Sequence, residues 1–438
     1  MRYFSSGSAG ILPSRQTATS VHGSRKSTFL NLGDFLVLCV PLLQCLQVHA
    51  VGVLFGTDLL LLAALPFVLA TRMNRLRNRQ IAIVLLLGLA WLIAQICTDV
   101  IRGSRPEDYL RGWSKIGLTV THLAVVWAVL RSSTRRFALY GIGLCVGGAL
   151  SCLITPNEFS LIDPWKFGLA IPVTLLVILS VSSLSGGRNR PIVLIALFAM
   201  SGVNLYLNLR SVGMICLVTG VYCYFQTQAQ TARLRLGWTK MVVTAGAVLL
   251  SVWGFQQLYT YAVTSGHLGQ DAQAKYEFQE QGEGGVLLGG RSEILASAQA
   301  IIDSPIIGHG SWARNAEYAA IGRERFAELG YKVGHHDEDD LIPTHSHVFG
   351  AWVESGVIGA IFWLWILKLT VGTILRVKGN EPLLPVFAFI AFLLCWDILF
   401  SPYGADRRFM ATYFIAVIVW VRSFGERSKY AAILDSRI

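Results

Sequence analysis

The sequence predicts an all-α protein that crosses a membrane many times and carries one large hydrophilic segment. Of the 438 residues, 53% are hydrophobic and only 14% are charged, which is more apolar surface than a soluble protein of this length can bury. Apolar runs of roughly 15–25 residues, the length that a bilayer core requires, recur along the whole chain. Basic residues gather in alternate connections between these runs, which is the positive-inside pattern of a multi-pass protein.

About twelve apolar runs are predicted as transmembrane helices. They lie near residues 34–50, 55–71, 80–97, 116–130, 137–155, 167–184, 192–208, 211–226, 241–256, 346–374, 383–401 and 409–424. The first nine fall within 34–256 and the last three within 345–424. Residues 1–33 contain basic residues and no acid, and no small-residue cleavage site follows the first run. They are therefore predicted to be a retained cytoplasmic tail, and 425–438 a second one.

The basic residues orient the chain. With the N-terminus inside, the cytoplasmic connections hold most of them: Arg72, Arg75, Arg77, Arg79, Arg131, Arg135, Arg136, Arg188, Arg190, Arg233, Arg235, Lys240, Arg376, Lys378, Arg427, Lys429 and Arg437. This orientation explains much of the net charge of +11 without nucleic acid as a partner.

A second group of cations is predicted on the outer side, against the orientation rule. Its members are Arg102, Arg105, Arg111, Lys115, Arg210, Arg407 and Arg408. Some of them are expected to extend to lipid phosphates. The others are candidates for a functional site.

The large hydrophilic segment, about residues 257–344, also falls outside and is predicted to fold over the membrane face. Its first part, "DAQAKYEFQEQGEGGVLLGG", is polar and then glycine-rich, which predicts a mobile stretch. "RSEILASAQAIIDSP" predicts a helix whose apolar face comprises Ile294, Leu295, Ala298, Ile301 and Ile302. "ARNAEYAAIGRERFAELG" predicts a second amphipathic helix that ends at Gly330.

All eight cysteines lie in apolar runs: Cys39, Cys45, Cys97, Cys145, Cys152, Cys216, Cys223 and Cys395. They are predicted to be small buried hydrophobic residues, not disulfides or zinc ligands.

The stretch "PTHSHVFGAWVESGVIG" is the strongest candidate for chemistry. On a continuous helix, His345, Phe349, Trp352, Gly356 and Gly359 would share one face, and the glycines would let a neighbouring helix approach closely. A neutral imidazole at the outer mouth of this seam is a plausible general base. The alternative is an interfacial histidine hydrogen-bonded to water.

Several motifs resemble those of bacterial O-antigen ligases, within the O-antigen ligase and polymerase superfamily. "HSHVFGAWVESGVIG" is similar to the family signature of His, then Asn, Ser or Gln, nine residues, and Gly-x-x-Gly. "NLRSVGM" resembles the short outer turn with Arg210, and "LGGRSEIL" the Gly-Arg motif with Arg291. "SPIIGHGSW" resembles a Pro-x-x-Gly-x-Gly turn, although His309 replaces the usual apolar residue. Asp397 in "LLCWDILF" matches an acid one span further on.

This resemblance implies a fold of the glycosyltransferase-C-like membrane type and an activity. A glycan on undecaprenyl diphosphate would be transferred to a sugar hydroxyl of lipid A–core, with inversion and without metal or cofactor, at the periplasmic face of the bacterial inner membrane. The implied partners are that donor, that acceptor and membrane lipids.

The resemblance implies that His345 is the general base, with His347 as the alternative imidazole. Arg210 and Arg291 would bind the diphosphate, because a guanidinium meets two phosphate oxygens at once. Asp397 is expected to pair with a cation or to orient a polar partner, and Asp58 is a weaker case of the same kind. The supporting cations are Arg102, Arg105, Arg111 and Lys115.

Other functions remain open at this stage. An O-antigen polymerase or a protein O-oligosaccharyltransferase of the same superfamily would differ only in the acceptor. A lipid-linked-glycan flippase or other transporter would also have many helices, but should place polar or broken-helix residues near mid-membrane. "GHHDEDD" (334–340) could bind a divalent ion, but consecutive loop acids favour a solvated charge cluster. The sequence does not fix the glycan structure, the acceptor sugar or the oligomeric state.

Overall fold

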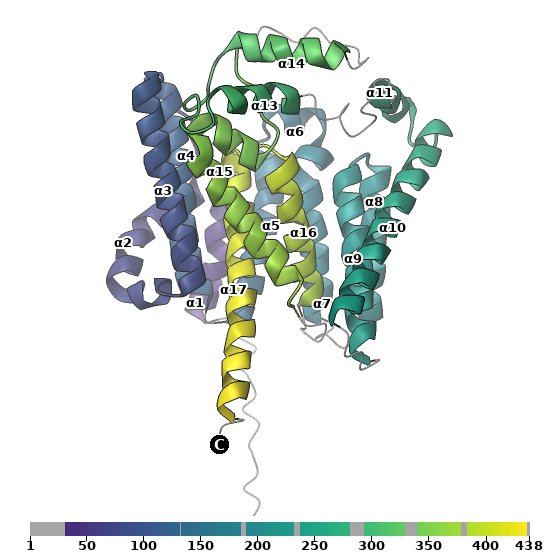
Figure 1. Cartoon of the computed structure of the whole chain (residues 1–438). Helices are drawn as coiled ribbons and strands as arrows, with labels where there is room; N and C mark the ends of the chain where they lie inside the picture. The colour runs from purple at the N-terminus through teal and green to yellow at the C-terminus, as the bar shows by residue number, and fades with distance from the viewer. Residues whose placement is uncertain are drawn as a thin grey trace, which may run out of the picture.

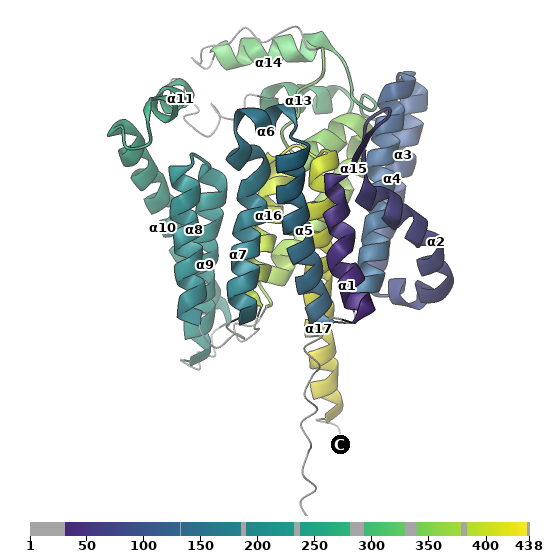
Figure 2. The ribbon, with the colours of Figure 1, turned by 180° about the vertical axis from the view of Figure 1, so that it is seen from behind.

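The computed structural model of the chain describes residues 31–131, 133–184, 190–231, 237–280, 293–328, 340–377 and 383–435. Nearly all of these residues are helical, and the helices run roughly side by side (Figures 1 and 2). The longer helices are α2 Gly56–Leu76, α3 Arg79–Arg102, α4 Pro106–Leu130, α5 Thr134–Ile154, α7 Ala170–Leu184, α8 Arg190–Tyr206, α9 Arg210–Thr231, α10 Gly237–Thr264, α15 His347–Ile374, α16 Leu384–Phe400 and α17 Ala405–Asp435. The shorter ones are α1 Leu32–Cys39, α6 Glu158–Ile162, α11 Gln270–Glu280, α13 Glu293–Asp303 and α14 Ala316–Glu328.

The predicted all-α polytopic membrane architecture is confirmed. Within the described ranges, 7 helices are long and apolar enough to cross a membrane: α2, α3, α4, α5, α7 with the preceding Trp165–Leu169 turn, the Val242–Thr264 part of α10, and α15. Three further apolar helical stretches are shorter: Leu32–Cys45, Pro191–Tyr206 and Leu384–Phe400. A helix covers each of the twelve predicted runs at least in part, and twelve crossings stay a prediction.

The helices α11, α13 and α14 lie across one end of the bundle (Figure 1), which we call the loop end.

Arginines from two of the predicted cytoplasmic connections, the one after α2 and the one after α4, contact each other's segments. Arg75 Nη1 donates to Ala128 O at 2.8 Å, and Arg131 Nη1 donates to Arg75 O at 2.7 Å. The connection between α2 and α3 and the connection between α4 and α5 are therefore joined at the foot of these helices.

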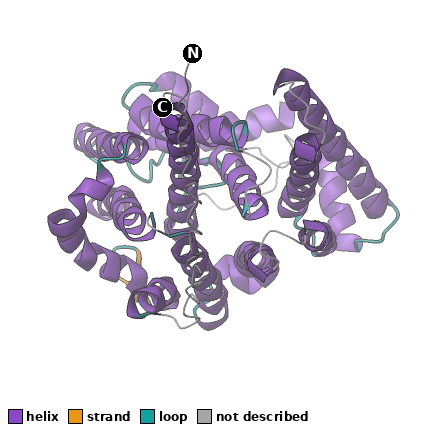
Figure 3. Ribbon diagram, turned by 90° about the horizontal axis from the view of Figure 1, so that it is seen from below, coloured by secondary structure: helices purple, strands orange, loops and turns teal. Residues whose placement is uncertain are grey.

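The first predicted run is not one helix. Helix α1 ends at Cys39 and continues as a 3₁₀ turn, Val40–Cys45, which has Pro41 in its first turn. A short antiparallel hairpin follows, with strands β1 Gln47–His49 and β2 Val53–Phe55, visible at the edge of the molecule in Figure 3. The proline explains the change, because it lacks the amide that an α-helix needs beyond its first turn. The predicted span 34–50 is thus wrong in its second half.

Helix α15 is broken, which corrects the predicted continuous face from His345 to Gly359. The helix begins at His347, after Ser346 as N-cap, so His345 lies outside it. Ser355 and Gly356 have non-helical backbone angles, and Gly356 has φ 68° and ψ −163°. This conformation is essentially restricted to glycine. At Gly359 the expected close approach is present, because an added Cβ would lie 3.0 Å from Trp91 Nε1 of α3.

The turn after α13 fills the break in α15. The amide of His309 donates to Val353 O at 2.7 Å, and the amide of Gly310 donates to Glu354 O at 3.0 Å. These amides thus replace helical donors that the break removes. Gly308 and Gly310 have φ 86° and 95°, so the glycines of the "SPIIGHGSW" motif allow the chain to turn into this position.

Replacing Gly356 by alanine should disrupt this joint. An alanine Cβ would collide with the Ile306 carbonyl oxygen, and the backbone strain alone costs roughly 1–3 kcal/mol. We expect a lower melting temperature of the purified protein in detergent. Gly117→Ala in α4 is the matched control, since its added Cβ meets nothing within 4 Å. Equal melting temperatures of the two variants would contradict the tight packing at the break.

Two expectations for the hydrophilic segment are corrected. The predicted mobile stretch begins as a helix, α11, because Ala272 and Tyr276 pack on Tyr259 and Val263 of α10. Residues 281–292 lie outside the described part of the chain.

In α13 the buried residues are Ala296, Ser297 and Ala300, whereas Ile302 is exposed. The small side chains face inward because α14 packs closely there: a Cβ on Gly322 would lie 2.9 Å from that of Ala296.

A buried charged cluster joins α2, α4 and α17. Asp58 Oδ2 is 2.5 Å from Arg408 Nη2, and Asp58 Oδ1 is 2.9 Å from His122 Nε2. Asp58 and His122 are fully buried, and the Arg408 side chain is 2% exposed. Arg408 is therefore the cation partner of Asp58. The sequence analysis had listed Arg408 only as one of the outer cations.

All eight cysteines are free. Three are buried, and Cys97 is exposed on α3, where the apolar side chains of Ile93 and Val100 are exposed as well. The prediction of a buried Cys97 is therefore wrong, because this side of α3 faces outward.

Candidate functional site

His345 stands at the loop end, immediately before α15. Ser346, the N-cap, accepts from the Phe349 amide at 3.3 Å and donates to Ile398 O at 2.8 Å, so the start of α15 is fixed against the end of α16. The His345 side chain is 42% exposed, and its Nδ1 lies 3.4 Å from Glu293 Oε1. Glu293 is the first residue of α13. An accessible imidazole and a carboxylate thus come together from positions 52 residues apart.

His347 has a different environment. It is buried, and its Nδ1 donates to Ser401 O at 2.6 Å. Its ring centroid is 4.7 Å from that of Trp363 and 4.9 Å from that of Tyr403. The side chain therefore fills the core between α15 and the α16–α17 turn. Of the two imidazoles, His345 is the one that a substrate can reach.

Arg210 begins α9 and faces α10 and α11. Its Nη2 donates to Gln279 Oε1 at 2.6 Å, and its guanidinium carbon lies 4.7 Å from the centroid of the Tyr259 ring. These contacts belong to α10 and α11, whereas the His345–Glu293 pair belongs to α13 and the start of α15. Arg291 lies outside the described residues, two positions before Glu293 in the sequence.

Two lysines surround Arg210 that the sequence analysis had not singled out. The pKa of Lys275 on α11 is lowered to about 8, first by burial and then by the nearby charges of Lys166 and Arg210. Asp163 acts on Lys275 in the opposite direction, as a weaker influence. Three cations therefore gather where α9, α11 and the Trp165–Leu169 turn meet. This arrangement suits a ligand with several negative charges.

Two of the supporting cations, Arg102 and Arg111, donate hydrogen bonds to loops of the protein. Arg102 Nε donates to Gly308 O at 2.9 Å and its Nη2 to Ser304 Oγ at 2.7 Å. Arg111 donates to Val51 O of the hairpin connection. Arg105 is exposed at the N-cap of α4. The contacts of Arg102 and Arg111 show that these two hold loops against α3 and α4.

Asp397 has the cation partner expected of an acid in an apolar helix. Its Oδ1 lies 2.7 Å from Arg407 Nη1, so the pair joins α16 to the start of α17. In the "GHHDEDD" segment, residues 334–339 lie outside the described part of the chain. Asp340 lies within it and is 2.9 Å from Arg314 Nη1.

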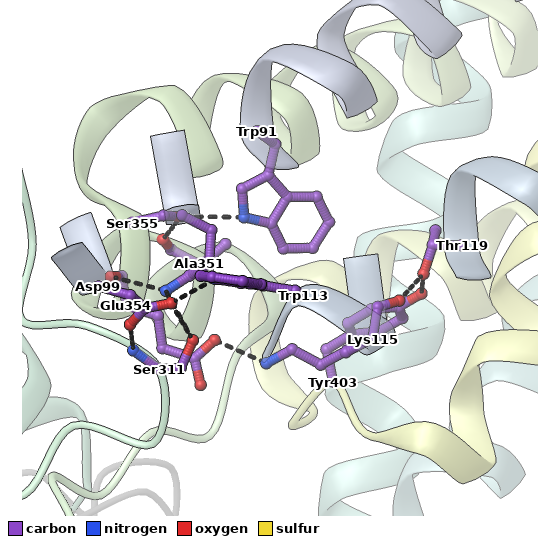
Figure 4. A network of polar contacts seen from close by, with 11 residues as sticks. Trp91, Asp99, Trp113, Lys115, Thr119, Ser311, Ala351, Glu354, Ser355 and Tyr403 are labelled. Atoms are coloured by element: carbon purple, nitrogen blue, oxygen red, sulfur yellow. Dashed lines mark hydrogen bonds and ion pairs between the residues drawn. The ribbon is translucent and has the colours of Figure 1, made fainter. Parts of the chain in front are cut away.

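A buried polar network lies next to the break in α15 (Figure 4). Asp99 accepts from the Ser311 amide at 2.6 Å, from Ser104 Oγ at 2.7 Å and from Trp113 Nε1 at 2.8 Å. Lys115 Nζ is 2.6 Å from Glu354 Oε2. The network attaches the turn after α13 to α3, α4 and α15. It thereby fixes the C-terminal end of α13, the helix that begins with Glu293 beside His345.

The family model described as "O-Antigen ligase" matches residues 195–364. This match supports membership of the chain in the O-antigen ligase superfamily. Within the matched part lie Arg210, Arg291 and the stretch from His345 to Gly359, together with Glu293 and Lys275. Asp397 and the cations of residues 102–115 lie outside it. The comparison with curated proteins gives no match.

The match with this family supports the interpretation of the loop end as the place of chemistry. Members are membrane enzymes of the glycosyltransferase type that use lipid-linked glycans. Sequence reasoning missed Glu293 and Lys275 because neither has a distinctive spacing. For Glu293 the available signal was its place one residue after "GRS", in the first turn of a predicted helix.

Proposed function

We propose that this protein is an O-antigen ligase. It transfers a glycan from undecaprenyl diphosphate to a sugar hydroxyl of lipid A–core, with inversion and without metal or cofactor. The observation that carries the proposal is the accessible His345 imidazole beside Glu293 at the loop end, within the part of the chain that matches the O-antigen ligase family.

We further propose that the loop end faces the periplasm of a bacterial inner membrane. Residues 257–344 would then be the periplasmic segment, residues 34–256 and 345–424 the membrane part, and both tails cytoplasmic. The contacts of Arg75 and Arg131 support this orientation, since basic connections stay on the cytoplasmic side.

In the proposed reaction, His345 accepts the proton of the acceptor hydroxyl while that oxygen bonds to the anomeric carbon. The bond from the anomeric carbon to the diphosphate oxygen breaks, and the diphosphate leaves with the electron pair. Arg210 and Arg291 stabilise its charge, and Lys166 and Lys275 add to the positive field around Arg210. Electrostatic stabilisation of this kind is usually the largest contribution to catalysis.

The broken α15 also bears on the transporter alternative. Unwound carbonyls of a broken helix often coordinate ions in transporters. Here the carbonyls of Val353 and Glu354 accept from loop amides of the protein itself. The break therefore anchors the loop, which favours an enzyme over a transporter.

The test is to supply the purified protein with lipid-linked glycan and separate acceptors: lipid A–core, a second copy of the lipid-linked glycan, and a peptide. Transfer to lipid A–core supports the ligase. Transfer to the glycan or to the peptide would instead identify a polymerase or a protein O-oligosaccharyltransferase. Movement of the donor across a vesicle membrane without transfer would contradict the enzyme function.

Binding of a prenyl diphosphate should weaken as the pH rises through the pKa of Lys275. That pKa is lowered to about 8, so the amine is charged at pH 7 and mostly neutral at pH 9. A site that needs this charge loses affinity by about tenfold over this range. The groups around Lys275 are Lys166, Arg210 and Asp163. The measurement is the affinity for farnesyl diphosphate at each pH.

Lys275→Arg is the matched variant for this experiment, because a guanidinium stays charged at pH 9. Its affinity should change little between pH 7 and 9. Lys275→Met should bind weakly at both values. An equal loss of affinity in the wild-type protein and in Lys275→Arg would assign the pH dependence to another group.

A further inference from the structure

The contact between Glu293 and His345 has the geometry of an oriented base. Glu293 Oε1 lies 3.4 Å from Nδ1 of the imidazole. Nδ1 is the ring nitrogen that a carboxylate holds in catalytic dyads, and the proton on it leaves the lone pair on Nε2. Distances in substrate-free sites are often longer than in the working complex.

Three features distinguish Glu293 from a solvated surface acid. Its side chain is 32% exposed, and its second oxygen, Oε2, is buried without a hydrogen-bond partner among the described residues. It also stands in the first turn of the 11-residue helix α13, where the helix dipole stabilises the ionised carboxylate. The fold therefore holds a negative charge beside the imidazole.

Hydrogen bonds beyond the C-terminal end of α13 hold this helix, and with it Glu293, in place. Beyond that helix, the Ser311 amide and hydroxyl donate to Asp99, at 2.6 and 2.7 Å, and Thr98 Oγ1 donates to Ile307 O at 2.7 Å. Ser297 Oγ donates to Glu293 O at 2.9 Å within the helix. His345 is fixed independently, through the attachment of Ser346 to α16.

We propose that Glu293 is a positioning residue for the reaction: it holds the proton on Nδ1 of His345 and directs Nε2 to the acceptor hydroxyl. This inference rests on the proposed function, in which His345 is the general base. During transfer, Nε2 takes the hydroxyl proton and the ring becomes an imidazolium. The Glu293 carboxylate stabilises that positive charge and remains ionised. After the glycan has moved, the proton on Nε2 passes to water.

The test compares Glu293→Gln with the wild-type protein in the transfer assay. Glutamine keeps the size of the side chain but removes the charge. We expect kcat to fall by about 10–100-fold, part of what a general base contributes, with the KM for the donor unchanged. The acidic limb of the pH profile of kcat/KM should also move to lower pH, because loss of a neighbouring negative charge lowers the pKa of an imidazole.

Glu293→Asp keeps the charge and should retain more activity than Glu293→Gln, with an unshifted pH profile. Glu317→Gln is the matched control, because Glu317 is an exposed acid in the first turn of α14; it should behave as wild type. A purely structural role of Glu293 would lower the fraction of active enzyme without moving the pH profile, and this result would overturn the inference.

The failure of the inference and the failure of the proposed function can be told apart. If the wild-type protein transfers glycan and His345→Ala does not, but Glu293→Gln keeps the wild-type kcat and pH profile, then the inference alone is wrong. If the wild-type protein transfers glycan to none of the acceptors, the proposed function fails and the inference fails with it.

Discussion

Replacing His345 by alanine should reduce glycan transfer to lipid A–core by about 10²–10⁴-fold, the contribution of a positioned general base. The loss should appear in kcat, because we propose that other residues, Arg210 and Arg291, bind the diphosphate of the donor. The side chain is 42% exposed, so the folded protein should keep its melting temperature. The measurement is initial-rate transfer by purified protein, supported by complementation of a ligase-deficient strain.

His267→Ala provides the matched control for this prediction. His267 is an exposed histidine in the connection between α10 and α11, and its removal should leave the rate unchanged. His347→Ala should behave differently from both, by lowering the melting temperature, because that ring packs against Trp363 and Tyr403. Normal transfer by His345→Ala would show that the base has been assigned to the wrong residue.

Replacing Asp58 by alanine should destabilise the protein by about 3–5 kcal/mol, the cost of leaving a buried charge without its partner. Arg408 Nη2 is 2.5 Å from Asp58 Oδ2, and the two side chains are 2% and 0% exposed. The expected result is a large fall in melting temperature and in the yield of folded protein. The double variant Asp58→Leu/Arg408→Leu should recover much of this loss, because it removes both charges.

Asp340→Asn is the control for the buried pair. Asp340 is 45% exposed and its partner Arg314 is 30% exposed, and such surface pairs contribute about 1 kcal/mol or less. The hydrogen bond with Asp340 raises the pKa of Arg314, and its guanidinium stays charged in the variant as well. Similar effects of Asp58→Ala and Asp340→Asn would mean that Arg408 finds another partner or reaches water.

The sequence predicts the helices well because each apolar run is a local property. The runs that became α3, α4 and α5 needed only their composition and length. Irregular features arise where a second segment intervenes. The break at Gly356 depends on the amides of His309 and Gly310, some 45 residues away, and no periodicity within α15 indicates it. Similarly, the predicted span 34–50 runs through Pro41, and neither the change of helix type there nor the hairpin after it was predicted.

The candidate site likewise has a part that the sequence predicts and a part that only the fold shows. His345, Arg210 and Arg291 were predicted as site residues through the resemblance of short motifs, which is visible in one sequence. The Glu293–His345 contact joins residues 52 positions apart, and the Asp99–Ser311 hydrogen bond joins residues 212 positions apart. Pairings of this kind exist only after the chain has folded. For Arg408 the sequence indicated only a position on the outer side, and its burial against Asp58 and Phe409 became visible in the fold.

The docking of the 304–312 turn into the gap of α15 sets a rule for exchanging loops between related chains. A graft that replaced this turn would leave two carbonyls of a membrane helix without donors and would remove the hydrogen bonds to Asp99. Hybrid proteins made to accept a new sugar should therefore keep Ser304 to Trp312 from the host. Helix α14, which carries none of the proposed site residues, is better suited to exchange.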